Sequence, residues 1–307
     1  MGNHTYCEAF HILAFSDTPV NHLLLFCIFF FIYWTAILGN LTLITLVSVD
    51  SRLHTPMYIL LSNLSFLDIC FITVTIPKAT AILLSGYNDI SFTHCFIQLC
   101  FYIFFGTTET IILSSMAYDR YVVICHPLHY KIIINGGTYA LIVVGPWIMG
   151  CVNSLCLALL VSNLSFCGVH DIEAFFCNIK SLYKISCNSS GFQTVIYVDA
   201  LIIGLFQFIL TLMSYTKIIM VTLRIKSSSG RMKSFSTCSS HLTSLVIFYG
   251  TMLGMYIRPP SEHADDLDNV FSVLNSAIIP MLNPLVYSLR NQEVKSAMVK
   301  MMPFKNK

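Results

Sequence analysis

The sequence predicts an all-α membrane protein, a bundle of seven transmembrane helices followed by a short amphipathic eighth helix. Hydrophobic residues make up 56% of its 307 residues and charged residues only 10%, whereas a soluble domain is roughly 25% charged. Its mean hydropathy is +0.74. Too few ionisable side chains are present to cover a core in water, which excludes a soluble globule. A formal net charge of +2 argues against nucleic-acid binding, which depends on clustered basic charge.

Long stretches with few or no charged residues define the seven helices, because a charge at the bilayer centre costs about 3 kcal/mol or more. Each stretch holds the roughly 20 residues that cross a bilayer. In chain order the predicted spans are 18–49, 56–84, 93–118, 132–170, 194–220, 234–257 and 269–289. Three of them contain ionisable residues, namely Asp68, Lys78, Glu109, Asp199 and Lys217.

The first span is expected to remain as a membrane anchor. No Lys or Arg precedes Arg52, and the apolar run 23–49 is far longer than the core of a signal peptide, which is about 7 to 15 residues. With the N-terminus outside, 13 of the 17 basic residues lie on the cytoplasmic side. The positive-inside rule therefore favours this orientation.

The same topology divides one receptor domain, 1–307, into loops and tails. Residues 1–22 form the extracellular N-terminus, 162–193 a long second extracellular loop, and 290–307 a cytoplasmic tail. Glycosylation triplets begin at Asn3, and also at Asn163 and Asn188 in the second loop. In the tail, an apolar face predicts a helix on the inner leaflet. Its members are Val294, Ala297, Met298, Met301 and Met302.

Five of the twelve cysteines face the outer, oxidising side: Cys7, Cys95, Cys167, Cys177 and Cys187. A bond from Cys95, at the start of the third span, to a loop cysteine would pull the second loop across the mouth of the bundle. A second bond would close a subloop. Five is an odd number, which leaves one thiol over, with Cys7 the best candidate, and spacing alone does not select the pairing.

Four strings resemble vertebrate olfactory (odorant) receptors, which are rhodopsin-like, class A G-protein-coupled receptors. They are Leu-His-Thr-Pro-Met-Tyr at 53–58, Met-Ala-Tyr-Asp-Arg-Tyr at 116–121, Phe-Ser-Thr-Cys-Ser-Ser-His at 235–241 and Pro-Met-Leu-Asn-Pro at 280–284. The first and third are typical of odorant receptors in particular. The resemblance covers nearly the whole chain, from Gly39 in the first span to Asn291 after the seventh.

The resemblance implies a function as well as a fold. A plasma-membrane receptor of this family binds a small, mostly hydrophobic odorant in the outer half of its bundle. It then activates a heterotrimeric G protein of the olfactory or stimulatory type, which raises cyclic AMP. It is not an enzyme. The resemblance also implies two disulfides, Cys95–Cys177 and Cys167–Cys187.

Asp119, Arg120 and Tyr121 lie at the inner end of the third span. Cys95 and Arg120 are 25 residues apart, about 37 Å along a helix, so this span connects the two membrane faces. An arginine here is either an interfacial side chain that reaches water or, as the resemblance implies, the group that contacts the G protein. The resemblance adds further coupling residues, namely Tyr215, Asn283, Pro284 and Tyr287, and a docking segment at 125–130.

Asp68 and Glu109 are carboxyl groups near the middle of the second and third spans. A buried carboxyl group without a partner takes up a proton, whereas two facing groups share a proton or bind a cation. We weigh two interpretations equally: an allosteric sodium site, with help from Asn283 and Asn40, and an ion-free hydrogen-bond network.

Helical periodicity in the outer halves of four spans predicts the residues around an odorant. They are Tyr102, Ile103, Gly106, Thr107, Asp199, Ile203, Tyr249, Met252, Leu253, Tyr256, Val273 and Ser276. Such a lining suits a small hydrophobic molecule with one functional group, although interhelical packing explains any single position equally well. Tyr249 matches the family's switch position. Asp199 binds a ligand hydroxyl or amine, or instead faces loop water or Lys180.

Two observations qualify the resemblance. Lys180 lies in a second-loop string, Cys-Asn-Ile-Lys-Ser at 177–181, where relatives usually carry an acid and prolines, and Gln207 stands where many carry proline.

A cation-coupled transporter is the alternative function, since Asp68, Glu109 and Asp199 could form a path. The sequence shows no internal repeat of the kind that transporters have, and no nucleophile–base or metal-ligand motif of an enzyme.

Overall fold

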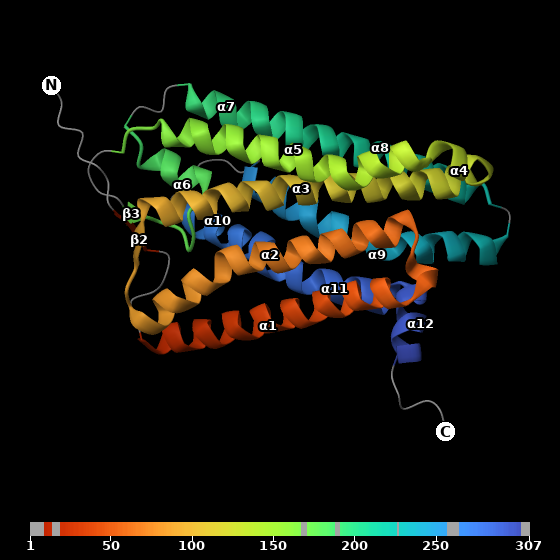
Figure 1. Cartoon of the computed structure of the whole chain (residues 1–307), viewed down its shortest axis with the longest axis horizontal. Helices are drawn as coiled ribbons and strands as arrows, with labels where there is room; N and C mark the ends of the chain where they lie inside the picture. The colour runs from red at the N-terminus through yellow and green to blue at the C-terminus, as the bar shows by residue number, and fades with distance from the viewer. Residues whose placement is uncertain are drawn as a thin grey trace.

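The computed structural model describes residues 9–13, 19–166, 171–187, 191–225, 227–256 and 264–301. Seven long helical segments run side by side along the longest axis of the molecule (Figure 1). They are α1 (Pro19–Val49), α2 (Pro56–Ser85), α3 (Phe92–Cys125), α5 (Gly136–Ser162), α7 to α8 (Phe192–Asp199 and Phe206–Leu223), α9 (Ser228–Tyr256) and α10 to α11 (Ala264–Val273 and Ile279–Arg290). The predicted seven-helix bundle is confirmed.

Two of these segments contain a π-helical turn, η3 (Ala200–Leu205) between α7 and α8 and η4 (Leu274–Ile278) between α10 and α11. Within the described residues, six of the seven segments are long and apolar enough to cross a membrane. The remaining one, α9, has 29 residues, about 43 Å of helix. Short helices α4 (Tyr130–Ile133) and α6 (Ile179–Lys184), with η1 (Ser51–Leu53) and η2 (Pro127–His129), lie in the loops.

The C-terminal helix α12 (Gln292–Met301) turns away from the bundle axis at the end opposite the strands (Figure 1). Its buried side chains are Val294 and Ala297. Asn291 caps the helix, because its side-chain oxygen accepts bonds from the amides of Glu293 and Val294. The predicted eighth helix is therefore present. Met302 lies outside the described residues.

A three-stranded sheet, which an all-α prediction does not contain, closes one end of the bundle. β1 (Ala9–Ile12) lies between β2 (Asp89–Ser91) and β3 (Asp171–Ile172), antiparallel to the first and parallel to the second. The side chains of Phe10 and Ile12 in β1 are buried. Part of the predicted extracellular N-terminus is therefore packed against the two loops rather than separate from the fold.

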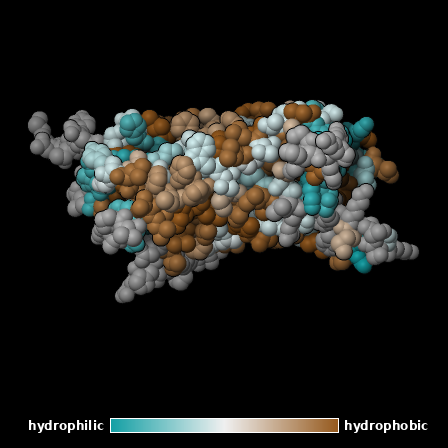
Figure 2. Space-filling view, turned by 90° about the horizontal axis from the view of Figure 1, so that it is seen from below, coloured by the Kyte–Doolittle hydropathy of each residue, from teal (hydrophilic) through white to brown (hydrophobic). Residues whose placement is uncertain are grey.

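Polar and apolar residues are distributed as expected for a protein surrounded by lipid. Large apolar side chains are exposed along the helices, among them Phe31 at 68% and Leu159 and Val246 at 65%. The visible face is mainly hydrophobic along its middle, with hydrophilic residues gathered towards the ends (Figure 2). In contrast, Asn40, Asp68 and Glu109 are buried between helices, where they escape hydrocarbon.

Candidate functional site

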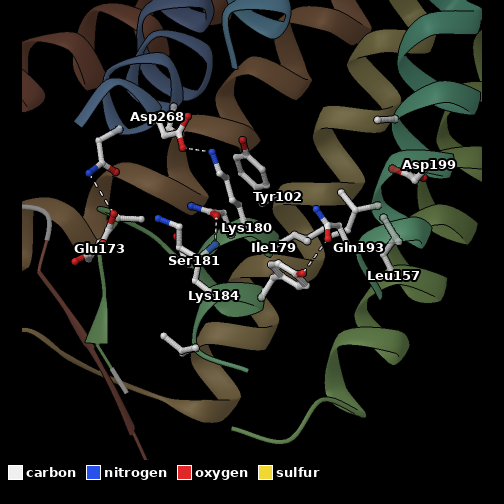
Figure 3. A pocket seen from close by; sticks show the side chains of 18 of the residues that line it. Tyr102, Leu157, Glu173, Ile179, Lys180, Ser181, Lys184, Gln193, Asp199 and Asp268 are labelled. Atoms are coloured by element: carbon white, nitrogen blue, oxygen red, sulfur yellow. Dashed lines mark hydrogen bonds and ion pairs between the residues drawn. The ribbon is translucent and has the colours of Figure 1, made fainter. Parts of the chain in front are cut away.

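A cavity of about 570 Å³ opens between the helices at the end of the bundle that carries the sheet. Figure 3 shows its walls: α3 contributes Tyr102, α5 contributes Leu157, and α7 contributes Gln193 and Asp199. The second loop, with helix α6, forms its cover. This volume lies within the range of roughly 300 to 1,000 Å³ that is typical of small-molecule sites.

Two contacts hold this cover to α10. The ammonium group of Lys180 in α6 forms an ion pair with the carboxylate of Asp268, and the Asn269 amide donates to the backbone oxygen of Glu173 at 3.2 Å. These contacts connect residues 88 and 96 positions apart in the chain. The Lys180 side chain is therefore engaged with Asp268 and not with Asp199.

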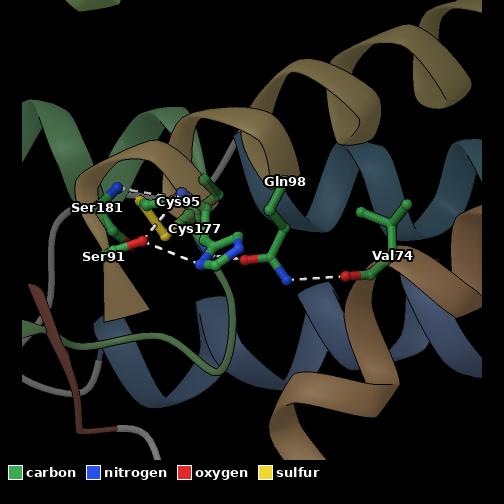
Figure 4. Close-up of a disulfide and its surroundings, with 8 residues drawn as sticks. Val74, Ser91, Cys95, Gln98, Cys177 and Ser181 are labelled. Atoms are coloured by element: carbon green, nitrogen blue, oxygen red, sulfur yellow. Dashed lines mark hydrogen bonds between the residues drawn. A yellow bond between two sulfur atoms is a disulfide. The ribbon is translucent and has the colours of Figure 1, made fainter. Parts of the chain in front are cut away.

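A disulfide anchors the same loop to α3. Cys95 and Cys177 are bonded, as the family resemblance implied. Next to them, the Gln98 side chain accepts a bond from the Cys177 amide at 2.9 Å and donates to the Val74 oxygen of α2 at 2.8 Å (Figure 4). Gln98 was not predicted as a site residue; its signal in the sequence is a long polar side chain one helical turn after Cys95.

The second predicted disulfide is partly described. Cys187 is disulfide-bonded. An isolated antiparallel β-bridge pairs Phe166 with Ser186, the residues that precede Cys167 and Cys187 in the chain. Cys167, Cys7, Asn3 and Asn188 lie outside the described residues, so the Cys167–Cys187 pairing stays a prediction. The remaining predicted glycosylation residue, Asn163, is exposed at the end of α5.

The structure brings only part of the predicted ligand set to this cavity. Tyr102 and Asp199 line it. Ile103, Thr107, Tyr249 and Ser276 are instead buried, Gly106, Ile203, Met252 and Val273 are partly buried, and none of the eight lines this cavity. Leu253 does not face inward, since its side chain is 43% exposed. A period of 3.6 residues groups residues on one face of a helix but does not fix the direction in which that face points. The Tyr256 side chain lies outside the described residues.

The polar side chains beneath the cavity include two, Asn153 and Thr211, that the sequence analysis missed. Asn153 of α5 donates to the Thr107 hydroxyl at 3.0 Å and lies near the carboxyl group of Asp199. The hydroxyls of Thr211 and Tyr249 are 3.4 Å apart. An asparagine inside an otherwise apolar span is the signal that could have identified Asn153, because such a side chain needs partners within the protein.

The carboxyl groups of Asp68 and Glu109 lie close enough to interact electrostatically. The Asn283 amide donates to both Asp68 oxygens, at 3.1 and 3.3 Å. Asn40 donates to the Pro280 oxygen at 2.9 Å, which holds α1 against α11. Within the part of the chain described, Oε1 of Glu109 and Oδ1 of Asn40 have no hydrogen-bond partner. These oxygen ligands suit a hard cation such as sodium.

Arg120 lies at the opposite end of α3 from the disulfide, and its side chain is 7% exposed. It is close enough to Tyr215, Tyr287 and His241 to affect them electrostatically. The preceding residue, Asp119, accepts a bond from the Tyr130 hydroxyl at 2.7 Å. Burial is the main cause that raises the pKa of Tyr130, and the bond to Asp119 raises it further. Arg120 Nε has no hydrogen-bond partner among the described atoms.

Two further features surround Arg120. The hydroxyl of Tyr215 in α8 lies 2.8 Å from Nδ1 of His241 in α9, which assigns a contact to the last residue of the Ser-Thr-Cys-Ser-Ser-His motif. Beyond α3, the tip of the predicted docking segment presents Leu128, which is 92% exposed. Tyr121, paired with His126 at 3.0 Å, lies beside this segment.

Squid rhodopsin has the same fold. Its crystal structure superposes on this chain with a TM-score of 0.75 at 16% identity, covering 94% of this chain and 82% of the squid protein. The arrangement of seven helices, with one disulfide end and one arginine end, is therefore the fold of rhodopsin. At the level of sequence, the family model for olfactory receptors matches residues 26–305.

Curated relatives agree with this match over nearly their full length. Olfactory receptor 1M1 of Homo sapiens is 40% identical over 300 residues, covering 97% of this chain and 96% of the relative. Olfactory receptor 13C9 of Homo sapiens is 43% identical over 308 residues, covering 98% and 96%. The chain belongs to the olfactory receptor family. It is a multi-pass membrane receptor that signals through G proteins, and not an enzyme.

Proposed function

We propose that the protein binds a small, mostly hydrophobic odorant in the cavity beneath the second loop and activates a G protein of the olfactory or stimulatory type, which raises cyclic AMP. The observation that carries this proposal is the path of α3. One end of this helix reaches the cavity at Tyr102, and the other presents Arg120 beside helices α8 and α9. A ligand that moves the cavity walls can therefore act on the arginine end.

The proposal includes an orientation in the plasma membrane, with the disulfide end extracellular and the Arg120 end cytoplasmic. Thirteen of the 17 basic residues belong to segments on the Arg120 side of the spans. The disulfide supports the same orientation, since such bonds persist in oxidising compartments. Under this orientation the exposed Asn163 triplet faces the outside, where glycosylation occurs.

A cyclic-AMP reporter in cells that display the full-length receptor tests this proposal. A panel of volatile molecules should include agonists that raise cyclic AMP, and Arg120→Ala should abolish the response while surface expression is retained. A response that survives Arg120→Ala would contradict the role of Arg120. Uptake of a labelled compound without G-protein activation would instead support the transporter alternative.

We also propose that Asp68, Glu109, Asn283 and Asn40 hold an allosteric sodium ion that stabilises the resting receptor. The support is the unpartnered buried oxygen of Glu109, which interacts electrostatically with the Asp68 carboxyl group that Asn283 binds, together with the unpartnered buried oxygen of Asn40. Replacing sodium with choline should raise the basal signal of the wild type, and Glu109→Gln should remove this sodium dependence. An ion-free network predicts that replacing sodium leaves the basal signal unchanged in both the wild type and Glu109→Gln.

A further inference from the structure

Asp199 places a carboxyl group on the wall of the cavity. This carboxyl group is partly buried on the α7 wall, just before the π-helical turn η3, and it lines the cavity. In Figure 3 it lies on the opposite side of the cavity from Asp268, with Tyr102 between them in the view. A carboxylate in an apolar wall is costly unless a cation or several donors satisfy it.

Within the described part of the chain, the polar side chain identified beside Asp199 is that of Asn153, which is neutral and also donates to Thr107. Among the described residues, no basic side chain forms an ion pair with Asp199. The two lysines of the cavity, Lys180 and Lys184, both belong to α6 in the loop cover, and Lys180 is bonded to Asp268.

The remainder of the lining suits a cation with an apolar body. Acids outnumber bases around the cavity: Asp171, Glu173, Asp199 and Asp268 against Lys180 and Lys184. Such an excess of negative charge raises the local concentration of cations. The apolar surface comes from both walls and the cover, and its members include Leu157, Ile179, Ile185 and Ile196.

We infer that this receptor recognises small aliphatic or arylalkyl amines, and that the Asp199 carboxylate binds the protonated amino group. The inference rests on the proposed ligand cavity and names the chemical class that this cavity selects. The apolar part of the ligand lies against Leu157 and Ile196, while Asn153 holds the carboxylate in place. Neutral odorants of the same shape bind more weakly, because they leave the charge of Asp199 uncompensated.

Matched pairs of ligands test the inference, each pair being an amine and its alcohol analogue, such as 2-phenylethylamine with 2-phenylethanol and hexylamine with 1-hexanol. Binding to the purified full-length receptor is measured by ligand-induced thermal stabilisation, and activation is measured in the reporter cells. Loss of a charge-assisted bond weakens binding by roughly ten- to a hundredfold. We therefore expect Asp199→Asn to reduce amine affinity by about that factor, and Asp199→Glu to restore most of it.

Glu173→Gln is the matched comparison, since it removes the same charge from an exposed position on the same cavity. Screening by water should limit its effect on amine affinity to less than about threefold. Equal effects of the two substitutions, or equal affinity of amines and alcohols for the wild type, would overturn the inference.

The two measurements separate this inference from the proposed function. Asp199-dependent binding of amines without G-protein activation would support the amine site and contradict the proposed signalling. Activation by volatile molecules other than amines, with no amine bound, would support the proposed signalling and overturn the amine site.

Discussion

At the scale of single residues, Gln98 connects three separate parts of the chain. Its side chain bonds the Cys177 amide of the second loop and the Val74 oxygen of α2, and it is 7% exposed. Gln98→Leu keeps the volume but leaves buried polar groups unpaired, at a cost of about 1 to 3 kcal/mol. We expect a lower melting temperature for the purified receptor.

Gln292→Ala is the control for Gln98, because Gln292 is exposed at the start of α12 and its side chain should contribute little. If both variants melt at the wild-type temperature, the bonds of Gln98 do not stabilise the loop.

His11 and Asp89 form a second residue-scale contact, between β1 and β2, with Nδ1 and Oδ1 2.5 Å apart. The hydrogen bond with His11 lowers the pKa of Asp89. A lowered folded-state pKa means that this stabilisation is complete above the unfolded-state pKa and is lost as the pH falls through the folded-state value. Attachment of β1 should therefore weaken in acid.

Hydrogen exchange measures this attachment at the amides of Ile12 and Leu13, which donate to Asn88 and Ile172. Corrected for intrinsic rates, their protection should fall between about pH 6 and about pH 2.5, values on either side of the ordinary aspartate pKa. Asp89→Asn should show low protection at both. Asp50→Asn, at the other end of the molecule, should behave as the wild type; unchanged protection in Asp89→Asn would contradict the role of this ion pair.

At the scale of whole elements, α3 and α5 approach closely at Gly150. A methyl group added there would lie 2.1 Å from the Thr108 hydroxyl and 2.9 Å from the Phe104 backbone oxygen. Gly150→Ala must therefore push the two helices apart, which typically costs about 1 to 3 kcal/mol. The melting temperature of the purified receptor should fall.

Gly145→Ala on the same helix is the matched control, since its nearest neighbour would be a Leu141 methyl group at an ordinary 3.6 Å. Alanine favours a helix over glycine by up to about 1 kcal/mol, so this variant should be as stable as the wild type or more so. Equal melting temperatures for the two variants would mean that α3 and α5 do not need the glycine.

The segment from α7 to α8 is bonded to α3 through Gln207. The side chain of this residue accepts a 2.5 Å bond from Ser114 of α3. The π-helical turn η3 ends two residues earlier. A π-turn inserts one extra residue into a helix and is frequent at functional sites. Here it follows directly after Asp199.

At the scale of the whole molecule, the Cys95–Cys177 disulfide connects the loop cover to the bundle across 82 residues. Replacing both cysteines with serine should destabilise the receptor by about 2 to 5 kcal/mol, as is usual for a native disulfide. Agonist potency should fall too, because the cavity loses a fixed cover. Melting temperature and cyclic-AMP dose–response curves measure the two effects.

Cys27→Ser provides the control, since Cys27 is a free, exposed cysteine on α1. If the double variant matches Cys27→Ser in both measurements, the remaining contacts, such as the Lys180–Asp268 ion pair, are enough to hold the cover.

The architecture of the molecule was predictable to different degrees in its different parts. Spans such as 56–84 and 269–289 agree with their helices within a few residues, because a bilayer requires each backbone hydrogen bond to be made within the segment. The fourth span was predicted as 132–170, whereas α5 covers Gly136–Ser162. There the chain leaves the helix through uncharged loop residues, so the absence of charge did not mark the end.

The site depended more on tertiary structure. The motifs located Arg120, Tyr215 and Tyr287 in the sequence, and the structure brings them together. Helical periodicity alone did not define the cavity, since nine of the predicted positions that the structure describes do not line it, and it missed the whole of α6. The cover of the cavity is a loop, and a loop's conformation follows from distant contacts rather than from local pattern.

The sequence by itself determined the membrane-spanning bundle, its connectivity and the two ends of α3, because hydropathy and helical hydrogen bonding are local properties of the chain. Tertiary structure decided which partner each charged residue of the cavity has. Lys180 is bonded to Asp268, 88 residues away, and Asp199 is left facing the cavity beside Asn153. Both outcomes depend on how α6 lies against α10, and that placement requires the folded loop, the disulfide and the sheet together.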